Sequence, residues 1–337
     1  MTSRKFLFTS LYVAISLFII FIFINFSLNE FGLFGDGKDK KYRVYALEKS
    51  SKYLFSFNYI PNNFNGILVG SSSSSLMMDT KNIKNNKIYN LSMNGANISE
   101  IKKVVDNILK FGDIKTFIIS FVPSLTKTSG MKSGQINSKE YYGTLQSDFV
   151  IRYYYYKFKA LRKGNKDIFY SSYNGYTDNS FALKNHNPTK EINREHHSLI
   201  TDNDSYFDID NIAFNQLNEM LKKVREKNIQ IFAYYYPFPK RLYEHVEFNP
   251  KYRLYKNKID STLDMKEDIV VNFNQDKYDY IRDIDENYFN THHLSKSGAS
   301  KIFKVINNKL KNNTFNVNTN KDTFQNIKYE EPFEKRK

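Results

Sequence analysis

Residues 67–72 read Ile-Leu-Val-Gly-Ser-Ser, an apolar run that passes directly into a turn of small residues. A short apolar run that ends in such a turn predicts a strand buried inside a sheet. The glycine and serines then predict a tight strand-to-helix turn. Because the first N–H groups of a helix have no partner within it, this turn places backbone donors beside a serine hydroxyl.

Strand-like and helix-like patterns alternate after this first strand. Further strands are expected at residues 87–91, 115–121, 229–236 and 268–273. Helices with one apolar face are expected from about residues 99, 211 and 297. Strands separated by helices predict a parallel sheet covered on both faces. We therefore expect an α/β three-layer sandwich over residues 65–311, with ligands bound beyond the carboxyl ends of its strands.

Three segments depart from this alternation. Residues 30–64 are rich in lysine, aspartate, tyrosine and asparagine and are expected to form an exposed lead-in. Residues 312–337 are expected to form a polar, frayed tail. A polar, Tyr-rich insertion covers residues at about 124–205. Within it, Arg152 and the tyrosines that follow either start a helix or line a binding surface, and an insertion packed on its own aromatic residues is the simpler interpretation.

Residues 6–28 are almost continuously apolar and carry no charge. This is the length of a helix that spans a membrane. No small-x-small cleavage motif follows, so residues 1–29 are interpreted as an uncleaved anchor rather than a signal peptide. Arg4 and Lys5 favour a cytoplasmic N-terminus; the basic residues at 38–43 argue the other way, but long domains translocate largely regardless of charge. The expected localisation is a single-pass cell membrane protein with an extracytoplasmic domain.

Composition excludes several classes of function. The chain has no cysteine, which excludes disulfides, thiolate metal sites and cysteine catalysis. Its net charge of +15 would attract polyanions, although an AT-rich codon bias raises the lysine content equally well. The sequence lacks a nucleic-acid-binding motif. The two histidines at 292–293 could be metal ligands, but no further ligand follows at the spacing of a metal site such as His-Glu-x-x-His. We therefore expect no nucleic acid partner, no metal and no cofactor; the histidines at 196–197 are interpreted as surface residues.

The serine turn has a possible catalytic partner late in the chain. A serine hydroxyl becomes a nucleophile when a histidine takes its proton and a third group orients that histidine. Ser72 is the candidate nucleophile, and His293, late in the chain, is the candidate base. The candidate donors to the oxyanion are the backbone N–H groups of Ser72 and Gly95. A run of serines is also typical of a loop or helix cap, and Asn-Gly of a tight turn.

Together these motifs resemble the SGNH/GDSL hydrolase-like superfamily. They are Gly-Ser-Ser after the first strand, Tyr-Asn-Leu-Ser-Met-Asn-Gly-Ala at 89–96, and Asn-Thr-His-His-Leu at 290–294 followed by Gly298. The plan is similar to that of membrane-anchored bacterial envelope proteins, namely polysaccharide O-acetyltransferases and teichoic-acid D-alanine transfer proteins. The resemblance implies a flavodoxin-like sandwich with Ser72 as nucleophile and Gly95 as the glycine of the second block.

The resemblance also implies a function. It predicts a serine esterase or O-acyltransferase acting on O-acyl groups of an anionic or neutral cell-surface glycopolymer, with a membrane-bound O-acyltransferase as partner. Asn290 stands where the family has aspartate, and an amide orients histidine without stabilising its cation. Asp283 or Asp285 is an alternative orienting group; without a Gly-x-Asn-Asp block, Asn97 and Ser120 are the candidate side-chain donors. The alternative function is a catalytically inactive envelope scaffold or glycan-binding protein on the same fold.

Overall fold

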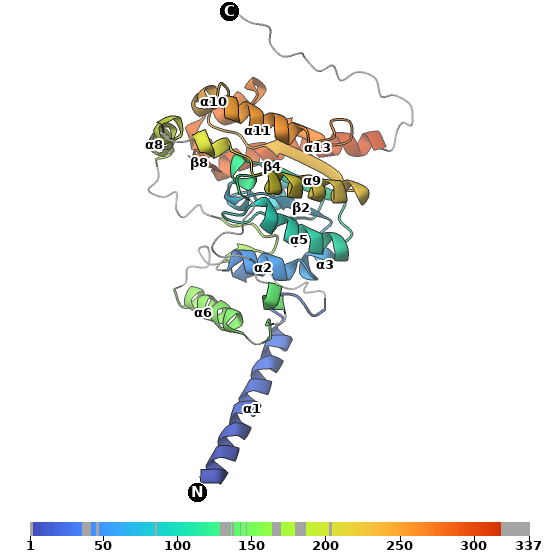
Figure 1. The fold of residues 1–337 in the computed structure, drawn as a ribbon, viewed down its shortest axis with the longest axis vertical. Coiled ribbons are helices and arrows are strands. Elements are labelled where there is room, and N and C mark those ends of the chain that lie inside the picture. Colours follow the sequence, from blue (N-terminus) through green and yellow to red (C-terminus); the bar gives the residue numbers. More distant parts are fainter. Residues whose placement is uncertain are drawn as a thin grey trace, which may run out of the picture.

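A long N-terminal helix projects from one end of an α/β domain in the computed structural model of the chain (Figure 1). This helix, α1, spans Ser3–Leu28 and is long and apolar enough to cross a membrane. The structure describes residues 3–35, 42–44, 47–84, 86–128, 136, 138–141, 143–145, 147–163, 170–178, 187–201 and 204–317.

A five-stranded parallel sheet forms the centre of the domain. Its strands are β2 (Gly66–Val69), β3 (Ile88–Asn90), β4 (Thr116–Phe121), β6 (Gln230–Tyr235) and β7 (Ile269–Asn272). They pair in the order β3-β2-β4-β6-β7, which is the flavodoxin-like order 2-1-3-4-5. Every residue of β2, β3 and β4 is buried, as expected of a parallel sheet covered on both faces. The strands predicted from the sequence are confirmed.

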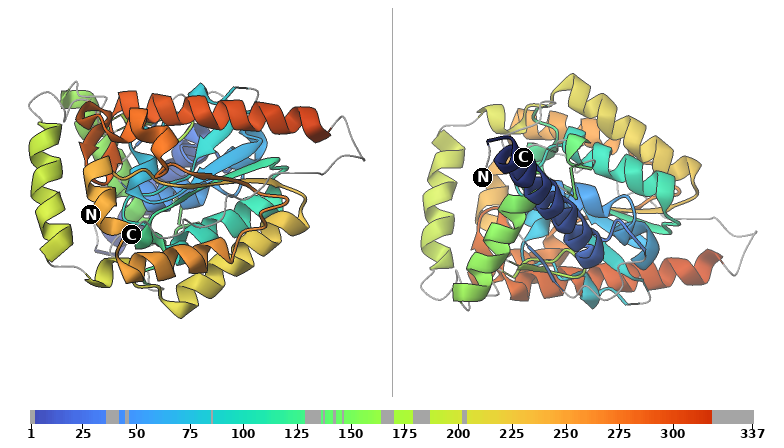
Figure 2. Two further views of the ribbon diagram at one scale, coloured as in Figure 1. Left: turned by 90° about the horizontal axis from the view of Figure 1, so that it is seen from above. Right: turned by 90° about the horizontal axis from the view of Figure 1, so that it is seen from below.

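Helices cover both faces of this sheet (Figure 2). On one side lie α5 (Ile98–Phe111), α9 (Asn211–Glu226) and α11 (Pro250–Asp260), and on the other lies α13 (Lys296–Val317). The predicted inner face of α5 is buried at Ile101, Val104, Val105 and Ile108. The three-layer α/β sandwich expected from the sequence is confirmed.

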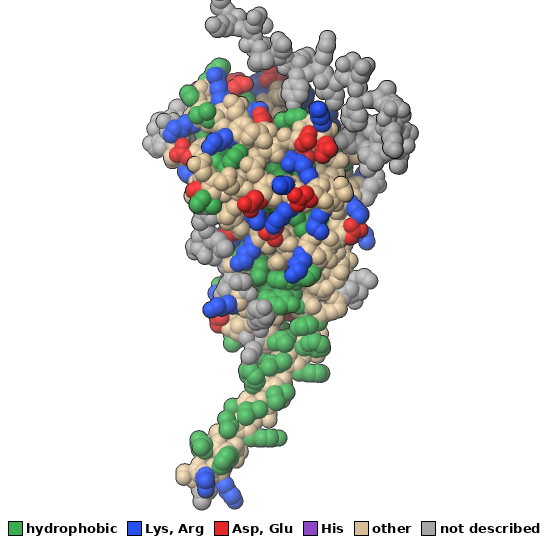
Figure 3. All heavy atoms as spheres, turned by 45° about the vertical axis from the view of Figure 1, so that its right-hand side comes forward, with side chains coloured by type: hydrophobic (Ala, Val, Ile, Leu, Met, Phe, Trp, Pro, Cys, Tyr) green, Lys and Arg blue, Asp and Glu red, His purple; other side chains and the backbone are tan. Residues whose placement is uncertain are grey.

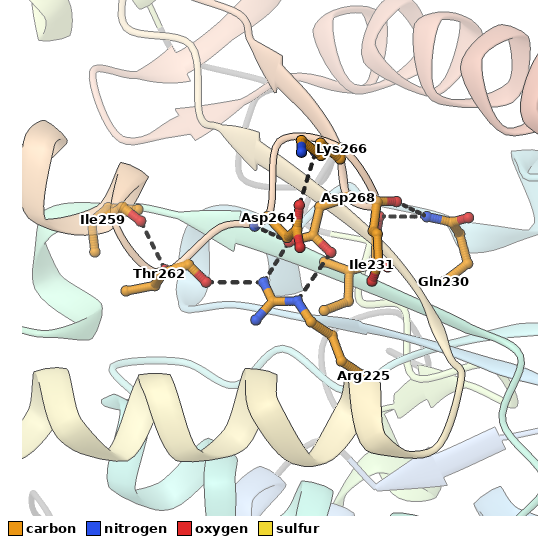
Figure 4. A network of polar contacts seen from close by, with 9 residues as sticks. Arg225, Gln230, Ile231, Ile259, Thr262, Asp264, Lys266 and Asp268 are labelled. Atoms are coloured by element: carbon orange, nitrogen blue, oxygen red, sulfur yellow. Dashed lines mark hydrogen bonds and ion pairs between the residues drawn. The ribbon is translucent and has the colours of Figure 1, made fainter. Parts of the chain in front are cut away.

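A partly buried ion pair joins the turn before the edge strand β7 to α9 (Figure 4). Arg225 Nη2 donates to Asp268 Oδ2 at 2.5 Å and to the Thr262 carbonyl at 2.9 Å. Asp268 also accepts the Asp264 N–H at 2.9 Å. Charge-assisted hydrogen bonds of this kind are about twice as strong as neutral ones. They hold the turn before β7 against the end of α9.

The expectation of an exposed lead-in is wrong for residues 48–64. These residues form α2 (Glu48–Phe55) and α3 (Tyr59–Asn63), which pack against α5. Leu54, Phe55 and Ile60 are fully buried. The two lysines of α2 made this segment look exposed. Both are buried, because Lys52 pairs with Glu48 of the same helix and Lys49 pairs with Glu100 of α5.

The insertion and the connections contain elements that the sequence did not define. The insertion includes α6 (Asp148–Lys163), α8 (Pro188–Thr201) and β5 (Tyr170–Ser172), which pairs with β1 (Tyr42–Val44). Shorter elements are α4 (Ser72–Ser75), α10 (Lys240–Val246), α12 (Asp279–Arg282) and the hairpin of β8 (Tyr288–Asn290) with β9 (His293–Leu294). Helix α13 continues to Val317, so residues 312–317 are helical and not part of a frayed tail, contrary to the expectation. Residues 318–337 lie outside the described part of the chain. The side chains of the histidines at 196–197 lie outside it as well.

Candidate active site

A cavity of about 230 Å³ lies beyond the carboxyl ends of β2, β3, β4 and β6. This is where the ligands of such open sheets bind. The side chains and turns that line it come from segments far apart in the sequence. They are Ser71, Ser72, Ser73, Gly95, Ala96, Val122, Ser124, Tyr206, Tyr236, Phe238, Thr291, His292 and His293. The structure therefore brings Ser72, Gly95 and His293 to one cavity.

Ser72 is the accessible member of the serine run. Of the five serines at 71–75, Ser72 alone is not buried. Gly70 permits this tight turn, because a Cβ at Gly70 would lie 3.0 Å from Ser74 and 3.2 Å from Ser120. Ser72 begins α4, and within the described part of the chain its backbone N–H donates no hydrogen bond. The hydroxyl and an available N–H group thus lie together at the cavity.

Gly95 lies in the turn after β3, on the same cavity. Its φ of +59° is in the left-handed region, which glycine adopts without a steric penalty. A Cβ at this position would meet no atom within 4 Å, and no hydrogen bond from the Gly95 N–H is found in the described part of the chain. The turn therefore presents a second backbone donor to the cavity.

Asn97 has a structural role in the same turn. Its side chain accepts the Glu100 N–H at 3.2 Å, and its own N–H donates to the Glu100 carboxylate at 3.2 Å. This reciprocal pair is a capping box at the start of α5. Asn97 is fully buried and does not line the cavity, so the structure does not bring it together with Ser72.

Helix α2 supports the Gly95 turn from below, a role that the sequence analysis missed. Lys52 Nζ donates to the Ser92 carbonyl at 2.5 Å, and Glu48 accepts the Asn94 N–H at 2.9 Å. Lys49 reaches the Gly95 carbonyl at 3.3 Å. Desolvation by burial lowers the pKa of Lys52 below its ordinary value, with Glu48 opposing the shift. Three residues of one short helix thus form hydrogen bonds with the backbone of this turn.

Asn290 and His293 form a hydrogen-bonded pair, and His293 lines the cavity. Asn290 Oδ1 lies 2.9 Å from His293 Nδ1 and also accepts the His292 N–H at 3.0 Å. Two donors on one oxygen fix the amide orientation, because an NH₂ group there would face an N–H donor. The proton of His293 then resides on Nδ1 and the lone pair on Nε2. Strand β9, which carries His293, contacts α4, which carries Ser72.

Aromatic side chains complete the cavity wall. The Tyr236 hydroxyl accepts the Leu294 N–H at 2.7 Å and so holds β9 against the sheet. Burial raises the pKa of Tyr236 well above its ordinary value, so this phenol remains protonated. Tyr206 lies with its hydroxyl 3.5 Å from His292 Nδ1. Together with Phe238 these rings make an apolar wall.

The remaining predicted site residues lie elsewhere. Asp283 and Asp285 line a second cavity of about 340 Å³, where Asp285 accepts both hydrogen bonds of Arg241 at 3.0 Å. Neither therefore takes the orienting position that Asn290 holds. Ser120 is fully buried under Gly70. Among the described residues there is no group of three metal-ligating side chains.

Comparison with known proteins adds little to this geometry. No protein-family model matches the sequence, and no curated protein matches it either. The fold is similar to the solved structure of a provisionally described platelet activating factor from Streptococcus pneumonia. That alignment covers 78% of this chain and 91% of the other, at 10% sequence identity and a TM-score of 0.41. A likeness at this level carries no functional argument.

Proposed function

We propose that this protein is a membrane-anchored serine esterase or O-acyltransferase. The observation that supports it most is the meeting of Ser72 and His293 on one cavity, with Asn290 orienting the imidazole. Ser72 and His293 lie more than two hundred residues apart in the sequence. The tautomer that Asn290 sets is the one that a general base requires. The hydroxyl of Ser72 would be the nucleophile, and the N–H groups of Ser72 and Gly95 would be the donors to the oxyanion.

The first half of the reaction forms an acyl-enzyme. The Ser72 hydroxyl transfers its proton to His293 Nε2 while Oγ bonds to the ester carbonyl carbon. The negative charge moves to the carbonyl oxygen, which the N–H groups of Ser72 and Gly95 stabilise. The carbon–oxygen bond to the leaving alcohol then breaks, and the alkoxide takes the proton from Nε2. The acyl group remains on Ser72.

The second half of the reaction releases the acyl group. An acceptor hydroxyl gives its proton to His293 Nε2 and attacks the acyl carbon, and Ser72 leaves with that proton. Water as acceptor gives hydrolysis, whereas a sugar hydroxyl gives O-acyl transfer. Asn290 fixes the orientation of the imidazole through Nδ1 but adds no charge to stabilise the imidazolium.

We propose a cell-surface glycopolymer, anionic or neutral, as the substrate. Helix α1 supports this because an anchor of its length keeps the domain at a membrane. Arg4 and Lys5, in the first turn of α1, favour an orientation that would put the domain outside the cytoplasm, where such polymers lie. A membrane-bound O-acyltransferase that delivers the acyl group is the proposed protein partner.

The test is covalent labelling of the full-length protein in detergent micelles with a fluorophosphonate probe. Turnover of p-nitrophenyl acetate is measured in parallel. We expect labelling and turnover in the wild type and the loss of both in Ser72→Ala and His293→Ala. Ser73→Ala is the matched control, because Ser73 lines the same cavity but is buried. Its Oγ is hydrogen-bonded to Ser71 Oγ at 3.2 Å.

The outcomes separate the two candidate functions. Selective loss at Ser72 and His293, with Ser73→Ala unaffected, supports serine catalysis. A folded wild type that neither labels nor turns over, even with membranes containing its acyltransferase, overturns the proposal. A non-catalytic scaffold or glycan-binding protein on the same fold would then be the better description.

A further inference from the structure

Helix α6 packs on the chain immediately after α1. Its inner face is formed by Phe149, Val150 and Tyr153, all buried. The ring of Phe31 lies 5.3 Å from that of Phe149 and 4.8 Å from that of Tyr153. Phe31 is only three residues beyond the last residue of α1, Leu28, so α6 lies where the apolar helix enters the domain.

Polar contacts fix α6 at this level. The Tyr153 hydroxyl donates to Glu30 Oε2 at 3.0 Å, and Lys157 forms an ion pair with the same carboxylate. Asn25, in the last turn of α1, donates to the Leu145 carbonyl at 2.8 Å, just before α6 begins. Because Glu30 is buried, these bonds tie α6 firmly to the end of α1.

The outer face of α6 is apolar although it faces solvent. Ile151, Tyr155 and Phe158 are 62%, 60% and 64% exposed. Their spacing of four and three residues places them on one side of the helix. In water an outward face is ordinarily polar, so an exposed apolar stripe indicates a surface that is covered by another apolar phase.

Basic side chains flank this stripe. Arg152 and Lys159 each follow one of its members, and Arg162 lies one turn beyond Phe158. Such a helix, apolar on one face and edged by basic residues, is typical of segments that lie in a membrane interface. Figure 1 shows α6 beside the domain end of α1, with its axis transverse to that of α1. Figure 3 shows hydrophobic side chains continuing from α1 onto the adjoining domain surface.

We propose that the outer face of α6 lies in the interface of the bilayer that α1 spans. Ile151, Tyr155 and Phe158 enter the boundary between headgroups and acyl chains, and Arg152, Lys159 and Arg162 contact the lipid phosphates. The domain then has two attachments to the bilayer, which fix its tilt. This inference depends on membrane insertion of α1 and is independent of the chemistry at Ser72.

The test uses the absence of natural cysteine, since each introduced cysteine is labelled uniquely. Tyr155→Cys and Phe158→Cys are labelled with an environment-sensitive fluorophore in the full-length protein. The protein is reconstituted in phosphatidylcholine–phosphatidylglycerol vesicles with and without nitroxide-bearing lipid. Phe248→Cys is the matched control, because Phe248 is a 70% exposed aromatic residue in the connection between α10 and α11. Figure 1 shows these two helices on the part of the domain away from α1. Phe18→Cys reports the insertion of α1.

We expect nitroxide lipid to quench the labels at 155 and 158 at least about threefold more than the label at 248, given an interfacial depth of about 5–10 Å. Quenching at 18 with none at 155 and 158 overturns the proposal and leaves the anchor intact. Labels at 155 and 158 that are shielded from water yet unquenched overturn it as well, because a protein surface then covers the face. Absence of quenching at position 18 would show that α1 is not inserted in the bilayer, and this result also overturns the proposal. The proposed chemistry at Ser72 is tested separately by the serine probe, because none of these cysteine variants alters Ser72.

Discussion

Asn290 Oδ1 lies 2.9 Å from His293 Nδ1, and the same oxygen accepts the His292 N–H at 3.0 Å. The amide thereby sets the tautomer of the imidazole and its direction. It performs the orienting part of a catalytic carboxylate without the charge. The imidazole of His293 therefore has a fixed orientation although position 290 holds an asparagine.

A carboxylate at 290 should therefore increase activity. In Asn290→Asp the negative charge stabilises the imidazolium that forms during acyl transfer, and we expect roughly a tenfold higher kcat for p-nitrophenyl acetate. The acid limb of the pH–rate profile should move to higher pH, because the carboxylate favours the protonated imidazole.

The control for this substitution is Asn290→Leu, which removes both the charge and the hydrogen bond. We expect its kcat to fall by about 10²-fold or more, since the imidazole loses its orientation. If Asn290→Leu keeps wild-type turnover, the pairing of Asn290 with His293 has no part in catalysis.

Substitution of Gly95 should reveal its left-handed backbone conformation. A Cβ at this position meets no atom within 4 Å, so any loss of stability comes from the φ of +59°. We expect Gly95→Ala to lower the free energy of unfolding by about 1–2 kcal/mol, and Gly95→Asn by less, because asparagine tolerates this region. Urea unfolding of the full-length chain in micelles measures both; equal losses would contradict backbone strain as the cause.

The buried pair below the Gly95 turn should be sensitive to loss of one partner. Lys49 Nζ lies 2.7 Å and 2.8 Å from the two oxygens of Glu100, and both residues are buried. Lys49→Met leaves the carboxylate without its cation and should cost about 3–5 kcal/mol.

The double variant tests whether charge is the reason. Glu100→Gln retains an oxygen for the Asn97 N–H, so Lys49→Met combined with Glu100→Gln should recover at least about 1 kcal/mol relative to Lys49→Met alone. A double variant less stable than the single one would show that packing rather than the uncompensated charge dominates.

Buried tyrosines should make the fold sensitive to alkali. Burial raises the pKa of Tyr234, Tyr236 and Tyr255 above the ordinary value of 10.0. Above pH 10 the unfolded chain loses these protons while the folded chain keeps them. The stabilisation is therefore complete below pH 10, and the free energy of unfolding falls by about 1.4 kcal/mol per pH unit for each such tyrosine above it.

Tyr255→Phe isolates one of these groups. Within the described part of the chain its buried hydroxyl has no hydrogen-bond partner, so the substitution should change stability little at pH 7. Between pH 10 and 11 the decline should be less steep by about 1.4 kcal/mol per unit. Unfolding curves at several pH values measure the slope; an unchanged slope contradicts the assignment.

The sheet could be predicted because its information is local. The apolar runs of β2, β4 and β6 and the one-sided pattern of α5 mark buried elements wherever they pack. Helix α2 could not be predicted in the same way. Both lysines of α2 are buried, and each needs a carboxylate partner. Lys52 pairs with Glu48 of the same helix, whereas Lys49 pairs with Glu100, which is distant in the sequence.

For the site, the sequence by itself determined which kinds of side chain are present and which strand each of them follows. Ser72 follows β2, the Gly95 turn follows β3, and Asn290 precedes His293 by three residues. Only the tertiary structure decided that Ser72, Gly95 and His293 share a cavity, that Asn97 caps a helix, and that Asp285 pairs with Arg241. The physical reason is that strand ends follow from local hydrophobic pattern, whereas the distance between two strand ends depends on strand order, which long-range packing sets.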